Sequence, residues 1–152
     1  MKRKLVAATV VASVGAAWVV DAAAQAKPEI LVKQRQAAMT LQGKYFGPLA
    51  GMAQGKLPYD ANIVQRNAGY LDVLDKMPWD GFDPSTKNVK SAALPAIWNE
   101  PAKFKEAQER LQSEVSRLVS VSKGGDEGAA KAQIGAVGKA CGNCHENFRE
   151  KQ

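Results

Sequence analysis

Cysteine and histidine are scarce in this chain of 152 residues, which contains two cysteines and a single histidine. A structural zinc site uses four such ligands, usually in two pairs, and the chain has no second pair. The sequence also has no internal repeat, no low-complexity tract and no glycine-rich phosphate loop. These absences argue against a zinc module and a repeat protein, and they direct attention to the cysteines and the histidine that are present.

Both cysteines and the histidine belong to one motif near the carboxyl terminus, Cys141-Gly142-Asn143-Cys144-His145. Cys-x-x-Cys-His is the attachment pattern of a c-type haem, in which both thiols bind vinyl groups and the imidazole binds the iron. In a helix, residues at i, i+3 and i+4 share one face, so all three side chains would reach the same flat cofactor. The alternative, a thioredoxin-like redox site, accompanies a βαβ pattern that the preceding sequence lacks. The motif therefore predicts one covalent haem c, with His145 as a ligand of its iron.

The amino terminus has the features of a secretory signal peptide. Basic residues at 2–4 precede an apolar run of 16 residues from Leu5 to Val20, and small residues then offer A-x-A-like cleavage sites at 22–24 and 24–26. The run is shorter than the roughly 18 to 20 residues of a membrane-spanning helix, so an uncleaved anchor is the less favoured alternative. Covalent haem attachment in bacteria takes place outside the cytoplasmic membrane. We therefore expect residues 1–26 to be removed and the protein to be periplasmic.

Removal of this segment leaves residues 27–152, a normal size for one domain with its own core and no membrane span. The formal charge falls from +6 to +4, because three basic residues and Asp21 leave with the segment. The remaining basic residues are scattered along the chain. This distribution argues against a nucleic-acid partner.

Proline and glycine divide the mature chain into four expected amphipathic helices. The first begins at Pro28 and ends between Gly51 and Gly55, and the second runs from Pro58 to about Lys76. Expected core positions in these two helices are Leu31, Val32, Ala38, Met39, Phe46, Leu49, Ile63, Leu71 and Leu74. Repeated proline between Met77 and Asn99 then excludes a long regular element.

The two remaining helices follow this loop. Asn99 is expected to cap the third, which ends at Lys123-Gly124-Gly125, and Asp126 to cap the fourth. Apolar positions in the third helix are Phe104, Ala107, Leu111, Leu118 and Val121, and those in the fourth are Ile134, Val137, Cys141, Cys144 and Phe148. Because the thiols continue the core seam of the fourth helix, we expect an all-α protein, an antiparallel up-and-down four-helix bundle that encloses the haem.

With these elements, the chain resembles the class II c-type cytochromes, specifically the cytochrome c′ family. In that family a signal peptide precedes a four-helix bundle, and the haem motif lies near the carboxyl terminus. The resemblance extends from Lys27 to Lys151. Besides the haem motif it rests on Lys27-Pro28-Glu29, Arg35-Gln36-Ala37-Ala38-Met39, Leu57-Pro58-Tyr59-Asp60-Ala61, Pro78-Trp79 and Ile97-Trp98.

The resemblance assigns further residues to the haem site. Met39 aligns with the distal pocket residue of the family, and Arg35 and Gln36 match positions at the haem edge, where an arginine can pair with a propionate. Arg149, one turn after the histidine, matches a basic residue of the proximal pocket, although alone it would be an ordinary cation near a helix carboxyl terminus. Trp79 could cover the haem edge, but a buried aromatic side chain needs no functional explanation.

The role of Met39 stays open at this stage. The resemblance favours a five-coordinate, high-spin iron with Met39 packed nearby, and the alternative is a low-spin His/Met carrier of the same family with Met39 as sixth ligand. Two functions follow: one-electron transfer with redox partner proteins, and binding of nitric oxide or carbon monoxide. An enzyme is disfavoured, because acid-base chemistry beside the iron usually recruits a histidine and the only one is already a ligand. Many members form homodimers, which is the expected assembly.

Overall fold

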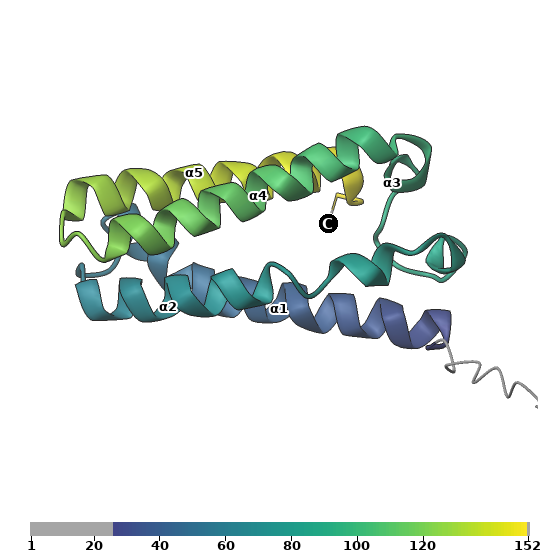
Figure 1. The fold of residues 1–152 in the computed structure, drawn as a ribbon, viewed down its shortest axis with the longest axis horizontal. Helices are drawn as coiled ribbons and strands as arrows, with labels where there is room; N and C mark the ends of the chain where they lie inside the picture. The colour runs from purple at the N-terminus through teal and green to yellow at the C-terminus, as the bar shows by residue number, and fades with distance from the viewer. Residues whose placement is uncertain (1–25, 152) are drawn as a thin grey trace, which may run out of the picture.

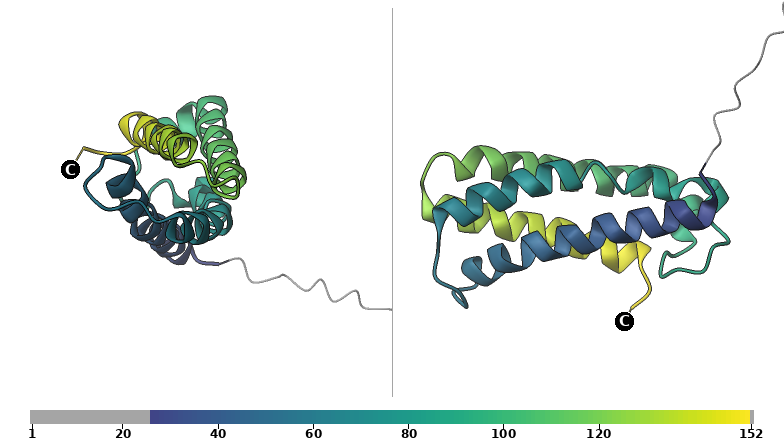
Figure 2. Two further views of the ribbon diagram at one scale, coloured as in Figure 1. Left: turned by 90° about the vertical axis from the view of Figure 1, so that its left-hand side faces the viewer. Right: turned by 90° about the horizontal axis from the view of Figure 1, so that it is seen from below.

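The computed structural model describes residues 26–151, which form a bundle of four long helices (Figures 1 and 2). These helices are α1 (Pro28–Ala53), α2 (Ala61–Leu74), α4 (Pro101–Ser122) and α5 (Glu127–Phe148). Helices α1 and α2 form one antiparallel pair and α4 and α5 another, and the two pairs pack against each other. The predicted all-α, up-and-down four-helix bundle is confirmed, while the predicted signal peptide lies outside the described residues.

Capping residues set the beginnings of two helices: Asp126 caps α5 as predicted, whereas Asp60 caps α2 at Ala61, three residues after the predicted start at Pro58. The Asp60 carboxylate accepts hydrogen bonds from the backbone N–H groups of Asn62 (2.8 Å) and Ile63 (3.1 Å) at the start of α2. Asp126 does the same for Ala129 at the start of α5, at 2.9 Å. These bonds satisfy backbone donors that have no partner within the helix.

Three short helices interrupt the connection between α2 and α4: η1 (Trp79–Phe82), η2 (Pro84–Thr86) and α3 (Ala96–Asn99). The prediction that no long element forms here is confirmed. The prediction that Asn99 caps the third long helix is wrong by one residue, because Asn99 ends α3 and Glu100 precedes α4. The reason is Pro101, whose fixed φ and missing N–H suit the first position of a helix.

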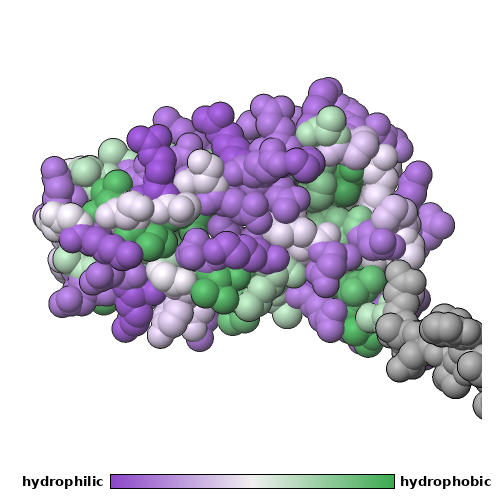
Figure 3. All heavy atoms as spheres, viewed as in Figure 1, coloured by the Kyte–Doolittle hydropathy of each residue, from purple (hydrophilic) through white to green (hydrophobic). Residues whose placement is uncertain are grey.

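The core lies between the two helix pairs and draws on all four long helices. Leu49, Leu118 and Ile134 are among its fully buried side chains, and Val64 and Val115, which were not predicted, are buried with them. The predicted Ile63 is only partly buried. Met39, Phe46 and Phe104 were also predicted in the core but are only partly buried. They border cavities described below, which explains their residual exposure. The face of the bundle in Figure 3 is mostly hydrophilic, with scattered apolar side chains.

The connection between α2 and α4 is attached to the end of α5. The Leu94 N–H donates to the Phe148 carbonyl (3.0 Å), and the Glu150 N–H donates to the Ala92 carbonyl (2.8 Å). Ala93 and Arg149 form an isolated antiparallel bridge between these two bonds. The bridge fixes the backbone at Arg149, four residues after His145. Among residues 26–151, no helix combines the length and the apolar character needed to cross a membrane.

Gly81 in η1 packs so closely on α1 that a larger residue is expected to destabilise the fold. An added Cβ would lie 2.5 Å from the Arg35 Cβ and 2.8 Å from the Leu31 carbonyl oxygen. We expect Gly81→Ala to lower the free energy of unfolding by about 2 kcal/mol in urea titrations, because the backbone must move. The control is Gly69→Ala in α2, where an added Cβ meets no atom within 4 Å and is expected to stabilise the helix by up to about 1 kcal/mol. Equal effects of the two changes would contradict this account.

Candidate functional site

Helix α5 places the motif Cys141, Cys144 and His145 in its last two turns. Both cysteines are free and partly buried, and the imidazole of His145 is half-buried. The helical state that was expected for these residues is therefore present, and it sets the two thiols and the imidazole on one face.

Two cavities, of about 390 and 350 Å³, lie against this face of α5. Both are bordered by Cys144, His145 and Arg149 from the end of α5 and by Met39 from α1. The eight predicted site residues all border one or both cavities: Arg35 and Gln36 the first, Trp79 and Cys141 the second, and Met39, Cys144, His145 and Arg149 both. The structure therefore brings together residues that lie as far apart in the sequence as Arg35 and Arg149.

A larger cavity of about 900 Å³ lies near the start of α1 and is bordered by Leu31, Trp98 and Phe104. Neither cysteine nor the histidine borders it. The lining residues of the two smaller cavities, and not the size of a cavity, therefore make them the candidate site.

Burial controls the protonation of the three motif side chains. Burial and the neighbouring Cys144 raise the pKa of the Cys141 thiol to about 11, and burial raises the pKa of Cys144 against the opposing charge of Arg149. Thiols of redox enzymes have lowered pKa values instead, so this pair lacks the character of a redox-active dithiol. Burial and the charge of Arg149 lower the pKa of His145, which keeps its imidazole neutral and able to bind a metal.

Arg35 is buried (3% exposed) and holds the connection between α2 and α4 against α1. Its guanidinium donates hydrogen bonds to the Gly81 carbonyl, to Thr86 Oγ1 (3.3 Å) and to Ser91 Oγ (2.8 Å). The guanidinium carbon lies 4.5 Å from the centroid of the Phe82 ring. Phe82 and Ser91 border the first cavity together with Arg35, so this side chain also shapes the cavity wall. The family resemblance did not indicate that structural role.

Trp79 and Arg149 are held by backbone contacts at the edges of the site. The Trp79 indole N–H donates to the Asp75 carbonyl, and its ring contacts Phe82 and Phe104 in tilted and edge-to-face geometry. Arg149 follows the last residue of α5 and has an exposed side chain, and its N–H donates to the His145 carbonyl at 3.1 Å. A hydrogen bond to His145, the candidate iron ligand, therefore fixes the position of the Arg149 backbone.

Asp75 borders the second cavity, although no sequence motif indicated it. It follows the last residue of α2, is 1% exposed, and neither carboxylate oxygen has a hydrogen-bond partner within residues 26–151. Burial and repulsion by Asp72 raise its pKa to about 7, with an opposing effect of Lys76. The available signal was its position four residues after Leu71, on the buried face of α2. Thr40 and Ser91 are further lining residues that were not predicted.

The side chains around the two cavities fit a covalently attached haem. Their lining is mainly apolar, and two thiols and a neutral imidazole from one helix face open onto it. Across residues 26–151, no three His, Cys, Asp or Glu side chains gather as a group that could hold a bare metal ion. An iron ion held here would therefore need further ligands from the cofactor that carries it.

Comparison with known proteins gives a consistent result. The family model described as Cytochrome C′ matches residues 30–149. Cytochrome c′ from Rubrivivax gelatinosus is 40% identical over 126 residues, which cover 82% of this chain and 98% of that protein. The crystal structure of the Rubrivivax gelatinosus protein superposes with a TM-score of 0.78 at 38% identity, covering 82% of this chain and 98% of that one.

Two further solved structures contain diatomic gases. A nitric oxide complex of a variant cytochrome c prime from Alcaligenes xylosoxidans has a TM-score of 0.76 at 37% identity, covering 83% of this chain and 98% of that one. A carbon monoxide complex of another variant of the same protein has the same TM-score, identity and coverage. Variants of a protein that is similar to this chain in both sequence and fold therefore bind nitric oxide and carbon monoxide.

Proposed function

The chain belongs to the cytochrome c′ family and is a c-type haem protein, and on that basis we propose that it transfers single electrons and binds nitric oxide or carbon monoxide. The observation that carries the proposal is the meeting of Cys144 and His145 on α5 with Met39 on α1 around the same cavities. The gas complexes of similar proteins support the second activity.

Three residues of α5 would hold the cofactor. We assign the two thioether bonds to Cys141 and Cys144, and the axial bond to the iron to His145. When bound, the haem supplies an iron that alternates between the ferric and ferrous states and that accepts a diatomic ligand. The helix holds the three side chains at fixed spacing, and burial keeps the imidazole neutral, so His145 is ready to donate its lone pair.

The charged and polar residues at the first cavity have a supporting role in this proposal. Arg35 and Arg149 both border that cavity, where their positive charges would favour binding of the haem propionates. Gln36 lies on the same helix as Arg35 and would add a polar contact at the haem edge. Trp79, which borders the second cavity, would exclude water from the haem.

Met39 is proposed to pack beside the iron without binding it, which leaves the sixth position open to gas. We expect high-spin optical spectra for the oxidised and the dithionite-reduced protein, and ready binding of carbon monoxide or nitric oxide by the reduced form. Met39→Leu is expected to keep these spectra, because leucine replaces the volume of the side chain without its sulfur.

The alternative outcome is equally clear in the same spectra. If Met39 were the sixth ligand, the protein would show sharp low-spin bands that Met39→Leu abolishes, and carbon monoxide would bind only to the variant. Met52→Leu is the matched control, because Met52 lies on the same helix, is buried in the core and borders neither cavity. Its spectra are expected to equal those of the unmodified protein.

The cellular setting completes the proposal. We propose that residues 1–26 direct export to the periplasm and are removed there, and that redox proteins are the partners. A homodimer would cover exposed apolar side chains of α1, of α2 and of the residues directly after α2, among them Leu41, Tyr70, Val73 and Met77. No catalytic role is assigned to any residue.

A further inference from the structure

We propose that Asp75 is a proton-binding site within the haem cavity, which takes up one proton when a one-electron donor protein reduces the iron. The inference rests on the electron-transfer function proposed above. It adds a group whose protonation follows the redox state and thereby makes the reduction potential depend on pH.

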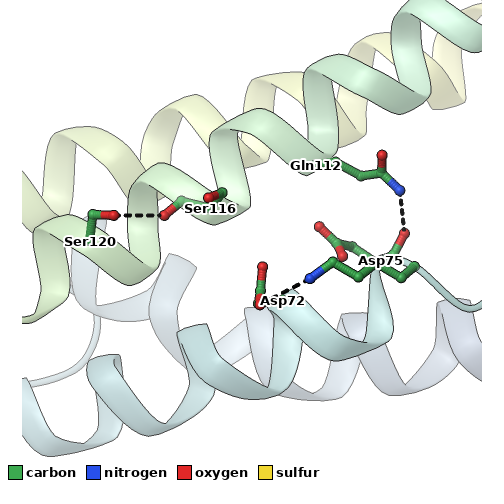
Figure 4. Close-up of polar contacts among 6 residues, drawn as sticks. Asp72, Asp75, Gln112, Ser116 and Ser120 are labelled. Atoms are coloured by element: carbon green, nitrogen blue, oxygen red, sulfur yellow. Dashed lines mark hydrogen bonds and ion pairs between the residues drawn. The ribbon is translucent and has the colours of Figure 1, made fainter.

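The geometry of Asp75 is that of a buried carboxyl group without a partner. The side chain is 1% exposed, and both of its oxygens lack a hydrogen bond within residues 26–151. Donors do lie nearby, but they bind the main chain: the Trp79 indole N–H donates to the Asp75 carbonyl. The Gln112 amide donates to the same carbonyl oxygen at 3.4 Å (Figure 4). An ionised carboxylate in such a place is costly, because burial disfavours the charged form unless it is paired.

The charges around Asp75 do not neutralise it. Lys76, which follows the end of α2, pairs with Asp72 on α2 at 3.1 Å, and both of these side chains reach solvent. At the end of α5, the cavity is bordered by Cys141, Cys144 and His145 and by Arg149 directly after the helix, of which only Arg149 carries a fixed positive charge. The cavity-lining residues of α1 and α4 and Trp79 of η1 carry no charge. No residue from these elements forms an ion pair with the carboxylate.

The pKa of Asp75, raised to about 7 by burial and by Asp72, places the group near its titration point at neutral pH. An electron added to the iron brings negative charge into the same weakly polar region, which raises the pKa of the carboxyl group further. In the coupled step, the donor protein would give one electron to the haem iron, and one proton would pass from solvent to a carboxylate oxygen of Asp75. On oxidation an acceptor protein would take the electron and the proton would return to solvent, so the net charge inside the bundle would stay constant.

The test is the reduction potential of the haem-loaded protein, measured by spectroelectrochemistry between about pH 5 and pH 9. With Asp75 present, the reduction equilibrium constant is expected to fall by up to tenfold per pH unit above about pH 7, which is up to 59 mV per unit for one electron. In Asp75→Asn this dependence is expected to disappear. Asp72→Asn removes the same charge from the surface of the same helix and is expected to retain it.

A second measurement needs no variant and covers the case in which Asp75→Asn fails to fold. The infrared difference spectrum between the reduced and oxidised forms is expected to contain a protonated-carboxyl band that shifts when aspartate is labelled with carbon-13. The bands of haem propionates and of glutamate side chains would not shift, because these groups do not carry the label. Two results would overturn the inference while leaving electron transfer intact. One is a carboxyl band that does not shift on labelling, and the other is a pH dependence of the reduction potential that is unchanged in Asp75→Asn. An iron that cannot be cycled reversibly would overturn both proposals.

Discussion

A variant in which Cys141 and Cys144 are both replaced by serine is expected to carry no covalently attached haem. The chain contains no other cysteine, so no sulfur remains to form a thioether bond. Either single variant is expected to retain one bond. The measurement is the mass of the purified protein under denaturing conditions, together with a haem stain of a denaturing gel, because only covalent attachment survives unfolding.

The matched control for this experiment lies between the two cysteines. Gly142 is exposed within α5, and an added Cβ there meets no atom within 4 Å, so Gly142→Ala is expected to carry covalent haem in full. Retention of covalent haem by the double variant would contradict the assignment of the thiols. Loss of haem in Gly142→Ala would show instead that attachment is sensitive to any change in this segment of the helix.

Replacing Arg35 by glutamine is expected to lower the free energy of unfolding by about 3 kcal/mol, which corresponds to a fall in Tm of roughly 10 °C. The change removes charged hydrogen bonds to Gly81, Thr86 and Ser91 and leaves their acceptor oxygens short of a buried donor. Arg35→Lys is expected to recover only part of this loss, since one ammonium group cannot reproduce the planar fork of donors. Thermal unfolding followed by circular dichroism measures both effects.

The control for Arg35 is Arg117→Gln on α4, where the side chain is exposed and an effect within about 0.5 kcal/mol is expected. A Tm for Arg35→Gln equal to that of the control would contradict the structural role described for this side chain. A normal Tm combined with a smaller fraction of protein carrying covalent haem would instead indicate that Arg35 acts only on the cofactor.

These two experiments separate two ways in which the chain builds the haem site. The cysteines act through covalent chemistry at one helix face, whereas Arg35 acts by holding the segment from Gly81 to Ser91 against α1. This segment contributes Phe82 and Ser91 to the wall of the first cavity. We therefore expect variants of Arg35 to alter the cavity even where Cys141, Cys144 and His145 are intact.

The bundle and most helix ends were predictable because their causes are local. Pro28 begins α1, and Asp60 and Asp126 each bond to backbone groups two or three residues away. Asn99 was misassigned because Asn99 and Pro101 are both typical of helix beginnings, and the proline set the boundary. Val115 was not among the predicted core positions, although it lies four residues after Leu111, one turn along the same apolar stripe.

The sequence by itself determined the motif of Cys141, Cys144 and His145, their common helix face, and the alternation of apolar positions that produces four helices. Each of these depends on residues within one or two turns of a helix. The tertiary structure alone decided that Arg35 bonds to residues 46 to 56 positions away, and that Asp75 faces a cavity without a partner. Such contacts depend on which faces of distant helices meet, because burial and hydrogen bonding across a bundle are set by packing and not by local spacing.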